Sequence, residues 1–178
     1  MRQPTPILLA PLRNEDQAAL FSWINDRALR LMNAPYRPVH AEEHRAWFEA
    51  LPRRSELAIF GIRLAETDRL IGSCQLHGIH AVHRSAELQI RIGEAGERGK
   101  GYGVEAIRLL LDFAFKDLNL HRVYLHVFAD NSAAIRCYQK AGFVREGLLR
   151  ERWHVMGETC DAAFYGLLAP EWRRRRGD

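Results

Sequence analysis

A glycine-rich segment that could bind an anion stands directly before a helical pattern and reads Arg98-Gly99-Lys100-Gly101-Tyr102-Gly103. Glycines let the backbone turn tightly and approach a ligand, and the amides and dipole at a helix start attract negative charge. No Gly-Lys-Ser or Gly-Lys-Thr follows, so the segment is not a Walker loop. A flexible turn without a ligand would have the same composition. On its own, the segment indicates a phosphate site without identifying the ligand.

A second segment about 30 residues further on places a tyrosine on a short helix. Asn131 or Ser132 is suited to cap that helix and Gly142 to end it, so Tyr138 lies within it. A phenol stays protonated near neutral pH and can donate a proton to a leaving group. The alternative role for Tyr138 is packing in the core.

A third group of polar residues alternates with apolar ones between residues 86 and 92. Glu87, Gln89 and Arg91 are separated by Leu88 and Ile90, which predicts a half-buried strand with one polar face. Glu87 on this face is a candidate general base. The alternative is an exposed carboxylate that pairs with Arg91 or with Arg84.

The first two segments together resemble the GNAT acetyltransferases, with R-G-x-G-x-G followed by N-x-x-A-x-x-x-Y-x-K-x-G-F. The resemblance extends from Leu8 to about Leu168 and implies acetyl-CoA as cosubstrate. It implies that Tyr138 protonates the departing thiolate and that Glu87 removes the amine proton, directly or through water. It also implies cosubstrate contacts from two sets of residues, which are the fourth strand and the loop with its helix start (Ile90, Arg91, Ile92, Arg98, Gly99, Lys100, Gly101, Tyr102, Gly103, Val104) and the tyrosine helix (Asn131, Ala134, Tyr138, Lys140).

Within that superfamily the chain looks like the branch of ribosomal-protein N-terminal, spermidine and amino-sugar acetyltransferases. The stretches that carry this resemblance are residues 23–26, 43–48, 83–90 and 146–150. The resemblance implies substrate contacts from Trp23, Asn25, Tyr36 and Glu87. The alternative for Trp23 is plain helix packing.

The acceptor is expected to be a primary amine on a small molecule or a peptide. Relatives that acetylate polyamines carry acidic residues near the position of Asn33-Ala34-Pro35, where this chain has none. A protein N-terminus or an amino sugar is therefore preferred over a polyamine. A polyamine acetyltransferase and a non-catalytic module that binds or senses acyl-CoA remain the alternatives.

The elements that must position these residues follow from apolar spacing. The pattern predicts a strand at residues 5–12, two helices up to about residue 51, and three strands at 57–63, 70–76 and 86–92. A helix from Val104, a strand at 123–127, the tyrosine helix and two strands around residues 156–158 complete the order. The predicted class is α/β (α+β), with a mixed, mostly antiparallel sheet, helices on both faces and, from the resemblance, a splay between strands 4 and 5.

Composition places the chain among ordinary globular proteins, with 178 residues, 47% apolar and 27% charged. We expect a single domain over 1–178 with a basic, solvated tail at about 171–178, where Arg173 to Arg176 contribute much of the net charge of +4. No aromatic residue is interleaved among these arginines, which disfavours nucleic acid as a partner. A homodimer is compatible with the sequence.

The apolar run Ile7 to Ala10 is bounded by Pro6 and Pro11 and is too short for a signal peptide or a membrane span, which predicts a cytoplasmic protein without a membrane partner. The three cysteines are widely spaced and predict free thiols. His77, His80 and His83 recur at three-residue steps, but they come without a carboxylate or cysteine at ligand spacing beyond Cys74. No metal site is predicted.

Overall fold

The computed structural model describes residues 5–32 and 37–177, and its elements follow the predicted order with two added helices. The added helices are α2 and α6, neither of which the sequence pattern predicted. The elements are β1 (Ile7–Ala10), α1 (Gln17–Asn25), α2 (Arg27–Leu31), α3 (Ala41–Ala50), β2 (Leu57–Leu64), β3 (Leu70–His80), β4 (Ser85–Ile92), α4 (Tyr102–Asp112), β5 (Arg122–Phe128), α5 (Ser132–Ala141), β6 (Val144–Val155), β7 (Glu158–Leu168) and α6 (Ala169–Arg176).

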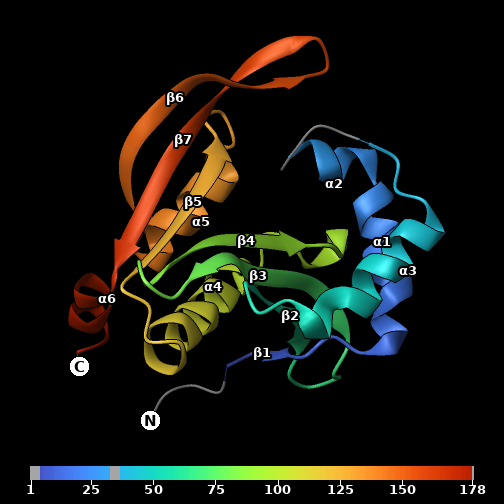
Figure 1. Cartoon of the computed structure of the whole chain (residues 1–178), viewed down its shortest axis with the longest axis horizontal. Coiled ribbons are helices and arrows are strands. Elements are labelled where there is room, and N and C mark those ends of the chain that lie inside the picture. The colour runs from blue at the N-terminus through green and yellow to red at the C-terminus, as the bar shows by residue number, and fades with distance from the viewer. Residues whose placement is uncertain (1–4, 33–36, 178) are drawn as a thin grey trace.

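The strands form one sheet in the order β1-β2-β3-β4-β5-β7-β6. Every neighbouring pair is antiparallel except β4 and β5, which run parallel. The β6–β7 hairpin is long and extends away from the rest of the sheet (Figure 1). The prediction of a mixed, mostly antiparallel sheet is confirmed.

The parallel pair β4–β5 is joined over only three residues of each strand. Residues 85–87 of β4 pair with residues 122–124 of β5, and beyond them the two strands diverge (Figure 1). The predicted splay is therefore present. Because the ladder stops, the backbone N–H and C=O groups on the facing edges have no partner strand, and such groups require hydrogen bonds from elsewhere.

Helix α4 builds the main core with one face of its amphipathic pattern. Ala106, Ile107, Leu110 and Leu111 are fully buried and belong to one apolar cluster with Leu88 of β4. Side chains alternate along a strand, so the even-numbered residues of β4 face α4 and the odd-numbered ones face the opposite side. Helices α1, α2 and α3 gather at one end of strands β1–β4 (Figure 1).

A smaller cluster holds these N-terminal helices together. Leu20, Trp23 and Leu29 are buried there, with Trp47 and Phe48 of α3 packed against them. The short helix α2 begins at an Asp26 cap, whose carboxylate accepts a hydrogen bond from the Leu29 amide at 3.0 Å. No helix within residues 5–32 and 37–177 has the length and apolar character needed to cross a bilayer.

The basic segment predicted to be a solvated tail is instead helix α6. Trp172 is buried, its Nε1 donates to Asp112 Oδ1 at 3.3 Å, and Arg176 also pairs with Asp112. The helix start is capped by Glu171, whose carboxylate accepts from the Leu168 amide at 2.9 Å. Trp172 and Arg176 hold the helix against Asp112 of α4, while the other three arginines stay exposed.

Candidate active site

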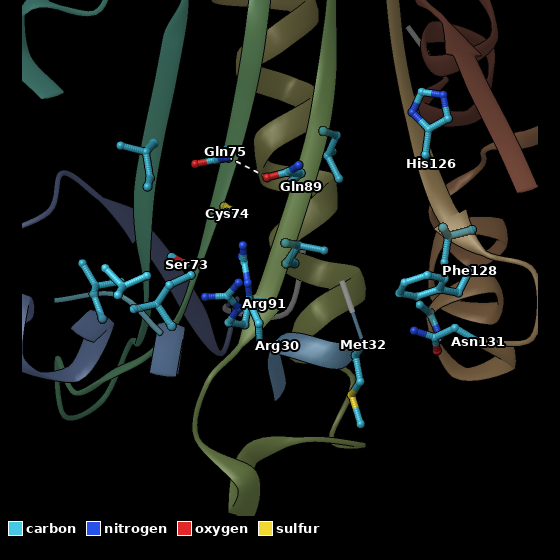
Figure 2. A pocket seen from close by; sticks show the side chains of 18 of the residues that line it. Arg30, Met32, Ser73, Cys74, Gln75, Gln89, Arg91, His126, Phe128 and Asn131 are labelled. Atoms are coloured by element: carbon cyan, nitrogen blue, oxygen red, sulfur yellow. Dashed lines mark hydrogen bonds between the residues drawn. The ribbon is translucent and has the colours of Figure 1, made fainter. Parts of the chain in front are cut away.

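A cavity of about 380 Å³ lies where β4 and β5 diverge. Figure 2 shows the side chains of Gln89 and Arg91 from β4 on one side of it and those of His126 and Phe128 from β5 on the other. Helix α5 adds Asn131, Ala134 and Tyr138, and the N-terminal helices add Leu20, Ile24, Arg30, His44 and Trp47.

The β6–β7 hairpin also reaches this cavity. Trp153 of β6 is one of the lining residues, and its ring packs edge-on against Phe128 with the centroids 4.6 Å apart. The cavity is thus bounded by three groups of elements, which are the helices α1–α3, the strands β2–β5 with α5, and the hairpin.

The predicted phosphate loop has the backbone geometry of an anion site. Gly99 and Gly101 adopt φ of +78° and +88°, a region that residues with a side chain rarely occupy. A Cβ at either position would meet no atom within 4 Å, so the space beside the backbone is open. Gly101 is the N-cap of α4, and the first amides of that helix have no intrahelical partner. Open space, free amides and a helix start coincide here.

Two basic side chains of the loop are already engaged. Arg98 donates from Nε to the Ile92 carbonyl at 3.0 Å and from a terminal nitrogen to the Gly93 carbonyl at 2.9 Å, which ties the loop to the end of β4. Lys100 Nζ contacts Glu97 Oε2 at 2.8 Å. Gly103 has a different role, because a Cβ there would lie 3.3 Å from Cys137 Sγ, and it lets α4 approach α5 closely.

Tyr138 is held on α5 by two caps that the sequence predicted. Asn131 Oδ1 accepts from the Ala134 amide at 3.1 Å, and Gly142 ends the helix with φ of +113°. Burial raises the pKa of Tyr138 above its usual value, so the phenol is protonated at neutral pH. Its hydroxyl makes no hydrogen bond to any residue that the structure describes. A neutral donor without a protein partner therefore lines the cavity.

Glu87 contacts two histidines rather than either arginine considered from the sequence. Its Oε1 lies 2.9 Å from His126 Nδ1, and its Oε2 lies 3.8 Å from His77 Nε2. Arg84 instead donates to Asn119, at 2.8 Å to the carbonyl and 2.7 Å to Oδ1. An ionised carboxylate only accepts, so Nδ1 of His126 carries the proton and Nε2 keeps a lone pair when the ring is neutral.

His126 is the functional candidate that sequence reasoning missed. His126 lines the cavity, whereas Glu87 does not line it and is hydrogen-bonded to His126. The signal was available, because Arg122, Tyr124 and His126 alternate along β5 with buried Val123 and Leu125. This alternation predicts that the imidazole of His126 lies on the same face of the sheet as Glu87.

Three residues on the polar face of β4 stand directly opposite polar residues of β3. Gln75 Nε2 donates to Gln89 Oε1 at 2.8 Å, as Figure 2 shows. The register also sets His77 opposite Glu87 and Ser73 opposite Arg91. Both glutamines, Ser73 and Arg91 line the cavity, which gives this wall several hydrogen-bond donors.

The structure brings together only part of the predicted cosubstrate site within the cavity. Ile90, Arg91, Asn131, Ala134 and Tyr138 line it. The other predicted residues lie outside it, at the end of β4, in the loop and on α4 and α5 (Ile92, Arg98, Gly99, Lys100, Gly101, Tyr102, Gly103, Val104, Lys140). Lys140 borders a separate hollow between α4, α5 and α6.

Two of the predicted substrate contacts have structural roles instead. Trp23 is buried, and a Cβ on Gly93 would come within 2.1 Å of its ring, so the indole packs flat against that backbone. Asn25 joins α1 to the segment before α3, since its side chain accepts from the Val39 amide at 2.9 Å and donates to the Val39 carbonyl at 3.1 Å. Neither residue lines the cavity. Tyr36 lies outside the described residues.

The histidines with three-residue spacing do not share one environment. His77 and His80 belong to β3 rather than to a connection, His77 lies near Glu87, and the His80 ring stacks on His83 at 4.2 Å. Within residues 5–32 and 37–177 no three His, Cys, Asp or Glu side chains are placed to hold a metal ion.

Comparison with known proteins identifies the class to which this fold and site belong. Residues 7–144 match the family described as acetyltransferase (GNAT) domain, which is more than half of the chain. The chain belongs to the GNAT acetyltransferase family.

Particular relatives differ in their named substrates. A putative ribosomal N-acetyltransferase of Bacillus subtilis, YdaF, is 30% identical over 167 residues, which are 93% of this chain and 91% of that protein. The spermidine N(1)-acetyltransferase of Vibrio cholerae is 40% identical over 106 residues, which are 60% of this chain and 61% of that enzyme. The sequence match therefore spans less than two thirds of that relative.

The structural match is more extensive than the sequence match. A crystal structure of spermidine N-acetyltransferase from Vibrio cholerae in complex with CoA and spermine superposes with a TM-score of 0.86. It covers 94% of this chain and 98% of that chain, at 30% identity. The fold expected from the resemblance is confirmed.

Proposed function

We propose that this protein transfers an acetyl group from acetyl-CoA to a primary amine by direct attack in a ternary complex. The observation that carries the proposal is the unpartnered, protonated hydroxyl of Tyr138 beside a gap between two strands that stop pairing. Membership of the GNAT family and the relative crystallised with CoA support it.

The residues present fit acetyl-CoA. Open space beside Gly99 and Gly101 leaves room for a diphosphate against the amides at the start of α4. The unpaired edges of β4 and β5 offer hydrogen bonds of the kind that an amide-containing pantetheine arm can form. When bound, acetyl-CoA supplies a thioester carbonyl that an amine can attack.

The two protons of the reaction are assigned to two groups that line the cavity. Tyr138 holds the proton that the departing sulfur requires, on its phenolic oxygen. His126 Nε2 accepts the proton of the attacking amine, and Glu87 keeps the ring in the necessary tautomer through Nδ1. Glu87 thus acts through His126 in this proposal.

The acceptor is proposed to be a protein N-terminus or an amino sugar. Among the described lining residues Glu43 is the one carboxylate, and it is bound to Arg37, so the cavity has no free acid to hold a polycation. The net charge of +4 acts in the same direction. A polyamine is the second candidate, because relatives named for spermidine are among the most similar proteins.

A panel of acceptors tests the proposal directly. CoA thiol release is measured with a ribosomal-protein N-terminal peptide, an amino-deoxysugar nucleotide and spermidine at equal concentration. We expect turnover with at least one of the first two to exceed that with spermidine. A tenfold higher kcat/KM for spermidine would reverse the acceptor preference, and no thiol release with any amine would reject the transferase function.

Glu87→Gln is expected to lower kcat by roughly a hundredfold, the lower end of the usual contribution of a positioned general base. The glutamine amide can donate to Nδ1 and so place the ring proton on Nε2, where it blocks proton acceptance. The loss should be steeper for an alkylamine than for an α-amine, because deprotonation of the former costs about 3 kcal/mol more at pH 7. Steady-state rates with both amines give the comparison.

Glu66→Gln is the matched control for that variant, since Glu66 is exposed in the turn between β2 and β3. It should leave both rates unchanged. Equal losses for the two amines in Glu87→Gln would count against a role in proton removal and for a purely structural one.

A further inference from the structure

Two arginines meet on the wall of the cavity opposite α4. Arg30 comes from α2 and Arg91 from β4, and Figure 2 shows both side chains directed into the cavity. Each keeps its Nε buried without a hydrogen bond, and neither guanidinium forms a hydrogen bond or ion pair with any residue within 5–32 and 37–177. Both side chains are half-buried, and partly buried cations without counter-ions are costly because burial removes part of their hydration.

The nearby acids are occupied elsewhere. Glu43 binds Arg37, and Glu87 is hydrogen-bonded to His126. Burial, with a smaller contribution from the charge of Arg30, lowers the pKa of Arg91 to about 10, so both side chains remain charged at neutral pH. The positive charge of this wall is therefore uncompensated within the described protein.

The neighbouring groups extend the pair into a set of hydrogen-bond donors. Ser73 stands opposite Arg91 in the β3–β4 register, and the amide pair Gln75–Gln89 follows on the same face. A guanidinium matches the planar geometry of carboxylate and phosphate oxygens and binds them more strongly than it binds neutral acceptors. This wall has the chemistry of an anion site.

We infer that Arg30 and Arg91 bind an anionic group, a carboxylate or a phosphate ester, on the acceptor whose amine is acetylated. The inference rests on the proposed function and narrows its substrate class. The diphosphate of CoA is assigned to a different place, because Gly99 and Gly101 of the phosphate loop do not line this cavity. The same two charges repel a polycation from the acceptor side.

Matched acceptor pairs test the inference and separate its two anion sources. A dipeptide with a free carboxylate is compared with its C-terminal amide, and glucosamine 6-phosphate is compared with glucosamine. We expect at least a tenfold higher kcat/KM for the anionic member of one pair. The preferred pair shows whether the anion is a carboxylate or a phosphate ester.

Variants connect the preference to the two arginines. Arg30→Gln should raise KM for the anionic acceptor about tenfold, leave the neutral acceptor within twofold, and leave the Kd of acetyl-CoA unchanged. Arg91→Gln should raise the same KM about tenfold. Arg91→Lys should restore part of the preference. Arg27→Gln is the control, because Arg27 is an exposed arginine on the same helix as Arg30 and does not line the cavity.

Several results would overturn the inference. The first is an equal kcat/KM for the anionic and the neutral member of both acceptor pairs. The second is an effect of Arg27→Gln on KM as large as that of Arg30→Gln. The third is a variant that loses affinity for acetyl-CoA and keeps its affinity for the acceptor. Turnover of the neutral acceptors without an anionic preference would leave the proposed function intact while rejecting the anion site. Calorimetric titration of the dipeptide and of glucosamine 6-phosphate into wild type and Arg91→Gln needs no turnover, so it decides the anion site even if no acceptor is acetylated.

Discussion

Tyr138→Phe is expected to lower kcat by about 10²- to 10⁴-fold, the usual contribution of a positioned general acid, with the Kd of acetyl-CoA little changed. The substitution removes one oxygen from a side chain that is only 7% exposed and leaves its ring contact with Phe143 in place. Binding is preserved, and the departing sulfur loses its proton donor. Single-turnover thiol release, which isolates the chemical step, is the appropriate measurement.

Tyr165→Phe is the matched control for this variant. Tyr165 is buried at 2% exposure on β7 and does not line the cavity, so losing its hydroxyl should leave kcat within about twofold. A Tyr138→Phe enzyme that also turns over within twofold of wild type, with chemistry shown to limit the rate, would assign Tyr138 to packing.

The alkaline pH dependence of Tyr138 follows from its burial. The group acts in its protonated form, and burial raises its pKa, so its loss by ionisation moves to higher pH than for an ordinary tyrosine. Tyr138 itself should therefore cause no decline in rate between pH 7 and 9. Any decline in that interval would have to come from another group.

Gly101→Asp is expected to abolish binding of acetyl-CoA. It sets a carboxylate against the diphosphate, and it forces a side chain into a backbone conformation with φ of +88°, which costs about 1 to 2 kcal/mol. Wild-type protein at a ligand concentration of 100 times Kd should gain about 2.7 kcal/mol, or roughly 5 to 11 °C in Tm. The variant should show no shift in a thermal unfolding assay.

Two controls separate charge from backbone strain in that experiment. Gly101→Ala carries a comparable strain without the charge and should retain part of the shift. Gly96→Asp adds the charge nearby, where the backbone is ordinary and a Cβ meets nothing within 4 Å, and should retain all of it. An unchanged affinity of Gly101→Asp for acetyl-CoA would show that the diphosphate does not bind at this loop.

Local features of the site were predictable because each depends on a few adjacent residues. The cap at Asn131, the end of α5 at Gly142 and the left-handed glycines of the loop are set by the conformational preferences of those residue types. Helix α2 was missed because five residues are too few to show the helical recurrence of apolar residues, although Asp26 is a residue type that favours a helix cap. Helix α6 was missed because it is held by contacts of Trp172 and Arg176 with Asp112 of α4, which is distant in the sequence.

Contacts between distant elements were not predictable from spacing. The hydrogen bond from His126 to Glu87 depends on three residues of parallel pairing between β4 and β5. The meeting of Arg30 with Arg91 depends on how α2 packs over the sheet, which no local pattern encodes. Trp23 was considered both for substrate contact and for helix packing, and the structure places it in the smaller apolar cluster.

The three-part boundary of the cavity has a consequence for how this enzyme family can diversify. Tyr138 and the phosphate loop are built into α4 and α5, whereas Arg30 and Trp153 reach the cavity from a short helix and from a projecting hairpin. Substitutions at sites that share no contacts act nearly independently. The positions proposed to face the acceptor can therefore change during evolution while Tyr138 and the phosphate loop, which we propose to serve acetyl transfer, stay the same, so that one scaffold can evolve to serve chemically opposite amines.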